Sequence, residues 1–576
     1  MARQPSTPIS GGSTQGDDEA AAATRAEAAE SEAAAVGAGA STPPAAPGGD
    51  EPSLGASAGP VSAATLASRL LGVVREQVVA ALFGAGDYAD AFNIAFRVPN
   101  LLRDLFAEGA LSAAFVPTFT STMHKDGRPA AFRLGGQVMN ALAVLLLVVV
   151  VAGWLLAPTL VRLMAPGFTA VPGKLELTTL LARIMLPFLL VVALAAGAMG
   201  MLNSMRRFGH AAMAPVWFNV GSIVVTLAML PVCHALGWPP VVSLAVGVLA
   251  GGLLQFFFQV PPLWKLGFRP VWPPRFDHPG VRRIGLLMAP AAIGLSATQI
   301  NVVINSWLAS TLGTGAVSWL AYAFRILFVP IGLFGVALAT VSLPSLSRYA
   351  AERDFEGLKR TLNRAVRITV ALTMPAAFGL LVLGGPLTTL LYQHGHFSAF
   401  DSQQTANALA AYTVGLVCYS GIKVLVPAFY ALGDTRTPLV ASFIAVGVNF
   451  GLNLLFMHRF GHVGLALSTG LTAIFNFCQL WWWLRRKVGG LGGRRLAGSG
   501  GRILLASAAM GGVLYAFVWA TRGWMHRGLP GEAAVVGVGV ALGAAATLGA
   551  YRLFGVEERT ELESALTAVT RRLGRR

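Results

Sequence analysis

Charged side chains are scarce in this chain. Of its 576 residues only 12% are Asp, Glu, Lys or Arg, whereas 55% are hydrophobic. A water-soluble protein needs more polar surface than this to cover its core. Cysteine is also rare: Cys233, Cys418 and Cys478 stand singly, without metal-ligand spacing, and are interpreted as packing residues. Neither a phosphate-binding loop nor a catalytic triad is present. The scarcity of charged residues excludes a soluble protein and leaves an integral membrane protein as the class.

Apolar runs fill most of the chain instead. Stretches of about 20 residues, enough to span roughly 30 Å of hydrocarbon, recur from Val61 onward. They are continuous in Leu, Val and Ala rather than alternating, which predicts helices and not barrel strands. We expect an all-α polytopic membrane protein with about fourteen transmembrane helices, near residues 61–83, 88–121, 132–165, 175–205, 210–236, 239–265, 280–312, 315–347, 356–384, 402–432, 437–457, 462–486, 500–521 and 532–554.

The N-terminal segment has a different composition. Residues 1–58 are rich in Ala, Gly, Ser, Pro and Thr and contain eight acids and two arginines, which predicts a disordered acidic tail. Without it, the formal net charge of +17 becomes about +23 on the membrane portion. These basic residues are scattered among short connections rather than gathered on a soluble domain. We therefore expect no nucleic-acid partner.

Basic residues concentrate in every second connection between the expected helices. The intervening connections carry only about four basic residues against roughly twenty, so the positive-inside rule places the basic connections and both termini in the cytoplasm. The basic connections are 124–133, 206–207, 265–283, 348–364, 436 and 485–495.

Two segments of the chain are alike. FGAGDYADAFNIAFR (83–97) and LGTGAVSWLAYAFR (312–325) align with one deletion, so that their glycine pairs coincide and Arg97 matches Arg325. A duplicated hairpin in a membrane protein is typical of pseudo-symmetric transporters. We therefore expect a transporter built from two related halves.

Several arginines fall inside expected helices, where each costs roughly 2.5–3.5 kcal/mol near the bilayer centre. An acid three, four or seven residues away lies on the same helix face and can compensate the charge. Arg97 has Asp90 and Asp104 seven residues to either side, with Glu108 one turn beyond, and is interpreted as structural. Arg69 and Arg183 are intermediate cases, each with one glutamate, Glu76 or Glu176, two turns away.

Arg75, Arg103 and Arg325 have no acid at any of these spacings. Their charge must be met across helices, by water or by an anionic ligand. We favour a ligand, because intramembrane acids are few and the planar guanidinium suits phosphate.

Other polar groups give weaker indications. The intramembrane asparagines are interpreted as interhelical hydrogen-bonding groups rather than a cation site. They are Asn219, Asn301, Asn305, Asn449, Asn453 and Asn476. His394 and His396 stand near Asp401 but lack a convincing third metal ligand.

The segment ASRLLGVVREQVVAALFGAGDYADAFNIAFRVPNLLRDLFAEGALSAAFVPTFT (67–120) closely resembles the start of the MurJ (MviN) family of lipid II flippases. Further agreement lies in VSWLAYAFRILFVPIGLFGVALATVSLPSLSRYA (317–350), KVLVPAFYALGDTRTP (423–438) and GHVGLALSTGLTAIFN (461–476). The resemblance covers about residues 61–490. It implies a fold of the multidrug/oligosaccharidyl-lipid/polysaccharide exporter superfamily, with two six-helix lobes (59–270 and 271–490) around a central cavity. Two further helices and a basic cytoplasmic tail (491–576) would follow.

The resemblance also implies site residues. By motif position the family's essential arginines, its functional acid and a cavity serine fall on Arg69, Arg75, Arg103, Arg325, Asp90 and Ser318. The sequence departs from the family at Phe324, where an acid often stands, and at Asp104, where a second arginine is common. Some relatives have a sodium site with carboxylates between the helices that correspond to 280–312, 437–457 and 462–486. Here the helix at 437–457 offers only Asn449 and Asn453, so neither a metal nor a cofactor is predicted.

The function implied is that of a lipid II flippase, not an enzyme, in the bacterial inner membrane. It would move the undecaprenyl-pyrophosphate-linked precursor of peptidoglycan outward by alternating access. Asp90 is expected to pair with a cavity arginine when the site is empty. The expected partners are lipid II and membrane lipids, with cell-wall synthesis or division proteins left open. The alternatives are an exporter of another polyprenyl-linked glycan or a cationic drug, and a membrane glycosyltransferase.

Overall fold

The computed structural model describes residues 54–104, 110–273, 276–525 and 527–563, and all regular structure in these ranges is helical. The predicted tail lies outside them except for its last five residues, which are already part of the first helix. The first part of the chain contains α2 (Leu54–Phe83), α3 (Asp87–Arg103), α4 (Ala110–Met164), η2 (Pro166–Ala170), α5 (Lys174–Met185), α6 (Pro187–Ser204), α7 (Phe208–Leu236) and α8 (Val242–Lys265).

The second part begins with a long helix that connects the two groups. Its elements are α9 (Pro279–Ser310), α10 (Ala316–Pro330), the π-helix η3 (Ile331–Val336), α11 (Ala337–Ala351), α12 (Phe355–Tyr392), α13 (Ala399–Thr413), α14 (Leu416–Ala431), α15 (Arg436–Val488), α16 (Gly493–Ala520), α17 (Arg522–Met525) and α18 (Leu529–Leu553).

Two of these helices are too long to be single spans. α15 has 53 residues, about 80 Å of straight helix, but its backbone leaves the helical region at Gly461 (φ 57°). Asn449 donates to Thr472 across this break, so the two halves lie side by side. α4 is interrupted in the same way at Gly127 (φ 82°). Glycine meets the positive φ at both breaks without steric cost.

In the described part of the chain, nine helices are long and apolar enough to cross a membrane, and the pair α13 and α14, bent by 49°, makes a tenth span. The arginine-bearing helices α2, α3 and α9 are not among them. Once α4 and α15 are divided at their glycines, each helix predicted from the sequence overlaps helical structure in the described residues, with differences of a few residues at the ends, and the one predicted at 402–432 is broken between α13 and α14.

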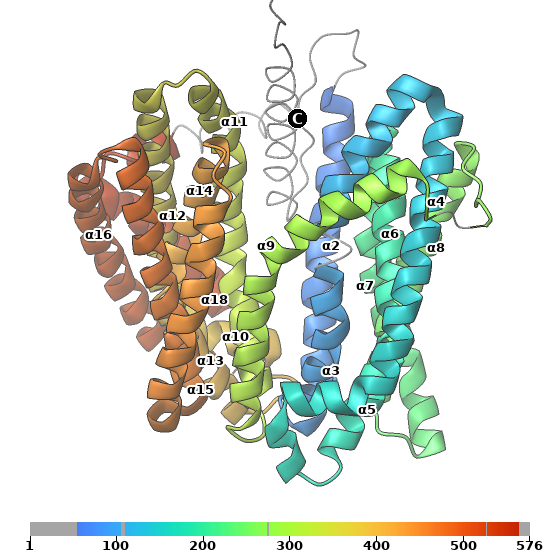
Figure 1. Ribbon diagram of the computed structural model, residues 1–576. Helices are drawn as coiled ribbons and strands as arrows, with labels where there is room; N and C mark the ends of the chain where they lie inside the picture. The colour runs from blue at the N-terminus through green and yellow to red at the C-terminus, as the bar shows by residue number, and fades with distance from the viewer. Residues whose placement is uncertain (1–53, 105–109, 274–275, 526, 564–576) are drawn as a thin grey trace, which may run out of the picture.

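The helices form two groups (Figure 1). α2 to α8 lie on one side and α10 to α18 on the other, with α9 crossing between them. α9 packs against α4 of the first group and α15 of the second, so it is shared by both. α16 and α18 pack against α12 at the outer flank of the second group.

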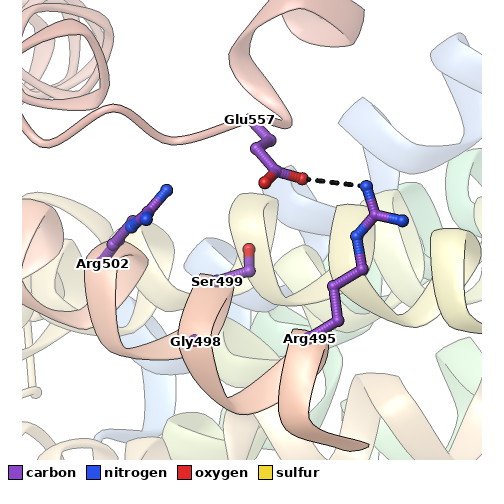
Figure 2. Close-up of a pocket in the computed structure, with 5 residues that line it drawn as sticks. All are labelled: Arg495, Gly498, Ser499, Arg502 and Glu557. Carbon is purple, nitrogen blue, oxygen red and sulfur yellow. Dashed lines mark hydrogen bonds and ion pairs between the residues drawn. The ribbon is translucent and has the colours of Figure 1, made fainter. Parts of the chain in front are cut away.

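Basic connections meet at one end of the bundle, which we call the basic end. There the segment after α18 is held to α12 and α16: Glu557 pairs with Arg367 (3.1 Å) and Arg495 (3.3 Å), and Arg502 donates to the carbonyl of Gly555 (3.2 Å). The hydrogen bond from Arg495, together with Arg367, lowers the pKa of Glu557. A small cavity of about 150 Å³ lies beside them, lined by Arg495, Arg502 and Glu557, of which Arg495 and Glu557 form an ion pair (Figure 2).

Candidate functional site

The opposite end of the bundle, which we call the far end, is closed by a buried carboxylate. Asp90 of α3 is fully buried. Its Oδ2 accepts from the amide of Gly315 (2.8 Å), and its Oδ1 accepts from the amide (3.0 Å) and hydroxyl (2.7 Å) of Ser318. Because these donors begin α10, Asp90 joins the first group of helices to the second.

Lys174 completes the arrangement and was not recognised in the sequence. Its Nζ lies 3.0 Å from Asp90 Oδ2 and 2.7 Å from Asp87 Oδ1, and 4.3 Å from the centroid of the Phe168 ring. Its side chain is only 2% exposed. We call Asp90, Lys174, Gly315 and Ser318 the Asp90 lock. The sequence offered one signal for this residue: Lys174 is an isolated lysine in a connection on the side that is poor in basic residues.

The expectation that Asp90 pairs with a cavity arginine is therefore wrong for the conformation described here. Asp90 lies near the start of α3, where the donors of α10 and Lys174 surround it. These partners use its oxygens, so no arginine is needed to compensate the buried charge.

Backbone contacts seal the far end beside the lock. The amide of His396 donates to the carbonyl of Ala81 (2.8 Å), and Tyr322 donates to the carbonyl of Gly84 (3.3 Å). Gly395 has φ +59°, and a Cβ there would collide with the Ala81 carbonyl. The two chain segments can approach this closely only because Gly395 has no side chain.

A second connection between the groups involves three charges. Glu76 of α2 pairs with Arg75 through Oε1 (3.0 Å) and with Arg325 of α10 through Oε2. All three side chains are partly exposed rather than sealed in the core. Arg75 and Arg325 thus share one carboxylate, and Glu76 is the residue that the spacing argument assigned elsewhere.

Glu76 does not compensate Arg69, which is exposed and has no ion pair among the described residues. Arg183 likewise does not reach Glu176. It packs over the Trp154 ring at 4.6 Å and donates to the Trp154 carbonyl.

Arg103 is also paired. Its guanidinium lies 2.9 Å from Oδ1 of the adjacent Asp104, whose other oxygen accepts from Gln299 of α9 (3.2 Å). In the conformation described, carboxylates therefore meet the charge of Arg75, Arg103 and Arg325, although none stands at the same-face spacings. Adjacent residues and residues of other helices supply the carboxylates, and the same-face spacings do not include either kind of partner.

Arg97 shows the opposite outcome, because acids were expected beside it and the structure places none of the described ones there. Its Nε is buried without a hydrogen-bond partner. Asp90 and Asp104, the acids expected to neutralise it, are bound by Lys174 and Arg103. Seven residues separate each acid from Arg97, about 10.5 Å along a helix, which is far for a short aspartate to bridge. The expected pairing of Arg97 with Asp90 or Asp104 is therefore wrong for the conformation described, and Glu108, the third acid expected near it, lies outside the described residues.

Asn453 and Asn219 form interhelical hydrogen bonds, as predicted, whereas the Oδ1 of Asn476 is buried without a hydrogen-bond partner. Asn453 of α15 donates to Asn305 of α9 (2.8 Å) and to Asn449 (3.0 Å), and Asn305 donates to Asn301 (3.3 Å). Asn219 donates to the carbonyl of Ser68. Among the residues that the structure describes, no three His, Cys, Asp or Glu side chains are grouped to hold a metal ion.

Comparison with known proteins assigns the chain to a family. Residues 79–537 match the family model for "Lipid II flippase MurJ". The chain belongs to the lipid II flippase MurJ family. This confirms the resemblance found in the sequence.

Relatives support the assignment along most of the chain. A probable lipid II flippase MurJ of Vibrio cholerae serotype O1 is 38% identical over 506 residues, covering 86% of this chain and 95% of that protein. The lipid II flippase MurJ of Burkholderia cenocepacia is 39% identical over 433 residues, covering 74% and 83%.

Solved structures agree on the fold. A lipid II flippase MurJ in an inward closed conformation matches with a TM-score of 0.70 and 26% identity, covering 87% of this chain and 99% of that one. An inward-facing multidrug resistance MATE family transporter of the MOP superfamily has a TM-score of 0.62 at 17% identity, covering 74% and 95%. The fold is therefore shared more widely than the MurJ family.

Proposed function

We propose that this protein is a lipid II flippase that moves the undecaprenyl-pyrophosphate-linked precursor across the inner membrane of a bacterium. Family membership carries the proposal, and the cationic groups on α2, α3 and α10 support it. Transport of this kind breaks and forms no covalent bond, which agrees with flippases being transporters rather than enzymes.

The substrate site that we propose consists of Arg69, Arg75, Arg103 and Arg325. A pyrophosphate leaving water needs charge compensation and hydrogen-bond donors, and guanidinium groups supply both. Glu76 holds two of these arginines in the conformation described. It would act as a substitute anion, which the pyrophosphate displaces on entry.

This displacement would also weaken the contact between the two groups of helices. The pair of Glu76 and Arg325 links α2 to α10, so a ligand that takes Arg325 away from Glu76 removes one connection between the two groups. A ligand shifts an equilibrium only by binding one state better. The pyrophosphate would bind better to the conformation in which Arg325 is free of Glu76, and it would therefore favour that conformation.

Asp90 and Ser318 belong to the closure of the far end in this proposal, rather than to the pyrophosphate site. The hydrogen bonds from Gly315 and Ser318 to Asp90 would break when the far end opens. Lys174 would stay with Asp90, since both lie in the first group of helices. The lobes proposed at 59–270 and 271–490 would then rock about α9.

The excess of basic residues at one end supports an orientation with that end and both termini in the cytoplasm. The far end then faces outward, and the molecule has the arrangement expected for taking up substrate from the inner leaflet. Lipid II is the partner we propose, surrounded by membrane lipids. Cell-wall synthesis or division proteins are further candidates.

Translocation of purified lipid II in vesicles tests the function directly. We expect the wild-type protein to expose lipid II on the opposite leaflet, and to move it in preference to other lipid-linked glycans. Alanine at Arg75, Arg103 or Arg325 should abolish rescue of cells depleted of their own flippase, at normal protein abundance. Full rescue by all three variants would refute the arginine site, and equal transport of unrelated glycans would refute the substrate.

A further inference from the structure

A second charged cavity lies at the basic end, away from the arginines of α2, α3 and α10. It has a volume of about 470 Å³ and lies where the connection from α14 to α15 meets the end of α15. Its lining combines Arg436, Arg486 and Lys487 with the apolar side chains of Phe429, Val440 and Trp483. The connection belongs to KVLVPAFYALGDTRTP, a family-like segment that the transport site does not use.

One acid and one lysine of this cavity are bound to each other. Asp434 accepts from Lys487 Nζ (2.6 Å), and from the amide (3.0 Å) and hydroxyl (2.6 Å) of Thr437. Burial alone would raise the pKa of Asp434, but these donors together lower it. Asp434 therefore stays ionised and caps the start of α15, and Lys487 is neutralised.

The two arginines have no such partner. Arg436 and Arg486 are both exposed, and neither has an ion pair with a carboxylate among the described residues. Arg486 instead lies 3.8 Å from the centroid of the Trp482 ring. This differs from the cavity in Figure 2, where a glutamate, Glu557, lines the cavity and is bound to Arg495. The cavity beside α15 thus retains two positive charges.

Apolar side chains continue from this cavity along α15. Val440, Phe443 and Ile444 are exposed and lie three and four residues apart on one helix face. Trp482 is also exposed, and tryptophan is enriched where a membrane meets water. A ligand that fits both parts has an anionic head for the arginines and an apolar chain for the α15 face.

We propose that this cavity binds the phosphate of an anionic glycerophospholipid from the leaflet at the basic end. Each guanidinium can donate two hydrogen bonds to phosphate oxygens, while an acyl chain covers the exposed face of α15. A free phosphate ion would use the arginines alone. The site is separate from the transport site, so the proposal does not depend on what the protein transports.

Photocrosslinking in vesicles tests the site. The full-length protein, with a benzophenone amino acid in place of Val440, is placed in phosphatidylcholine containing a minority of phosphatidylglycerol, and the lipid adducts are identified by mass. We expect phosphatidylglycerol to exceed its share of the bilayer among the adducts. Arg436→Gln or Arg486→Gln should reduce this enrichment by up to about fivefold, because one basic residue near the membrane surface is worth about that factor. The double variant should abolish it.

Arg485→Gln provides the matched control, since it removes the same charge from the same turn of α15 without lining the cavity. Its enrichment should equal that of the wild type. Adducts in proportion to bilayer composition, or an equal loss in Arg485→Gln, would overturn the proposal. Loss of the enrichment in excess inorganic phosphate would also overturn it, and would assign the site to the free ion.

Discussion

Removing one hydroxyl should open the far end of the molecule. Ser318 is fully buried; its Oγ donates to Asp90 (2.7 Å) and accepts from Asn93 (3.2 Å). Ser318→Ala deletes both bonds and leaves the backbone donors of α10 in place. A hydrogen bond to a charged group contributes roughly 1.5–3 kcal/mol. The closed conformation should therefore lose about ten- to hundredfold in population relative to the open one.

A buried reporter cysteine can measure this change. Ala85, in the connection between α2 and α3, is 1% exposed in the closed conformation. With the native cysteines replaced, the rate at which a maleimide modifies Ala85→Cys should follow the fraction of open molecules. We expect Ser318→Ala to raise that rate by about ten- to hundredfold.

The control variant removes a buried hydroxyl that does not connect the two groups of helices. Ser306 is also buried, but its Oγ donates to Val302 of its own helix (2.8 Å). Ser306→Ala should leave the modification rate unchanged. If Ser318→Ala were modified at the wild-type rate, or if both variants were equally faster, the Asp90 lock would not hold the far end closed.

Four further outcomes are expected. Gly395→Ala should raise the same modification rate, because its Cβ collides with the Ala81 carbonyl; Gly385→Ala, with open space around it, should not. Glu76→Gln should bind lipid II about tenfold tighter in a pull-down assay, because the competing anion is gone; unchanged binding would contradict its role as a substitute. Arg325→Ala should lose most lipid II binding at normal abundance. Asp434→Asn should lower the melting temperature at pH 7, and the difference from wild type should shrink as the pH falls from about 4 through the lowered pKa of Asp434, because the carboxyl group stabilises the fold only while it is ionised.

The helices were predictable because their signal is local. Apolar runs and the alternation of basic connections depend on neighbouring residues alone, and they gave the helical class and the order of the elements. The boundary near residue 58 was missed by a few residues, since α2 begins at Leu54. The alanines and glycines of that stretch resemble the tail in composition, although the structure includes them in a helix.

The partners of the arginines were not predictable by the same means. Glu76 reaches Arg325 across 249 residues of sequence, and Asp90 reaches Lys174 across 84. Such pairs depend on how the helices pack. The aligned residues Arg97 and Arg325 show the consequence: the one expected to be paired has an unbonded Nε, and the one expected to be free has a carboxylate. Counting along one helix cannot reveal acids that another helix supplies.

Asp90 and Lys174 both lie in the first group of helices, and this affects how the opening of the far end responds to the membrane voltage. If the lobes rock as proposed, these opposite charges travel together, and their displacement moves almost no net charge through the membrane field. Opening of the far end should then be nearly independent of voltage. Any electrogenic part of the cycle would have to arise at the arginines, where charges of one sign outnumber the acids and a substrate anion comes and goes.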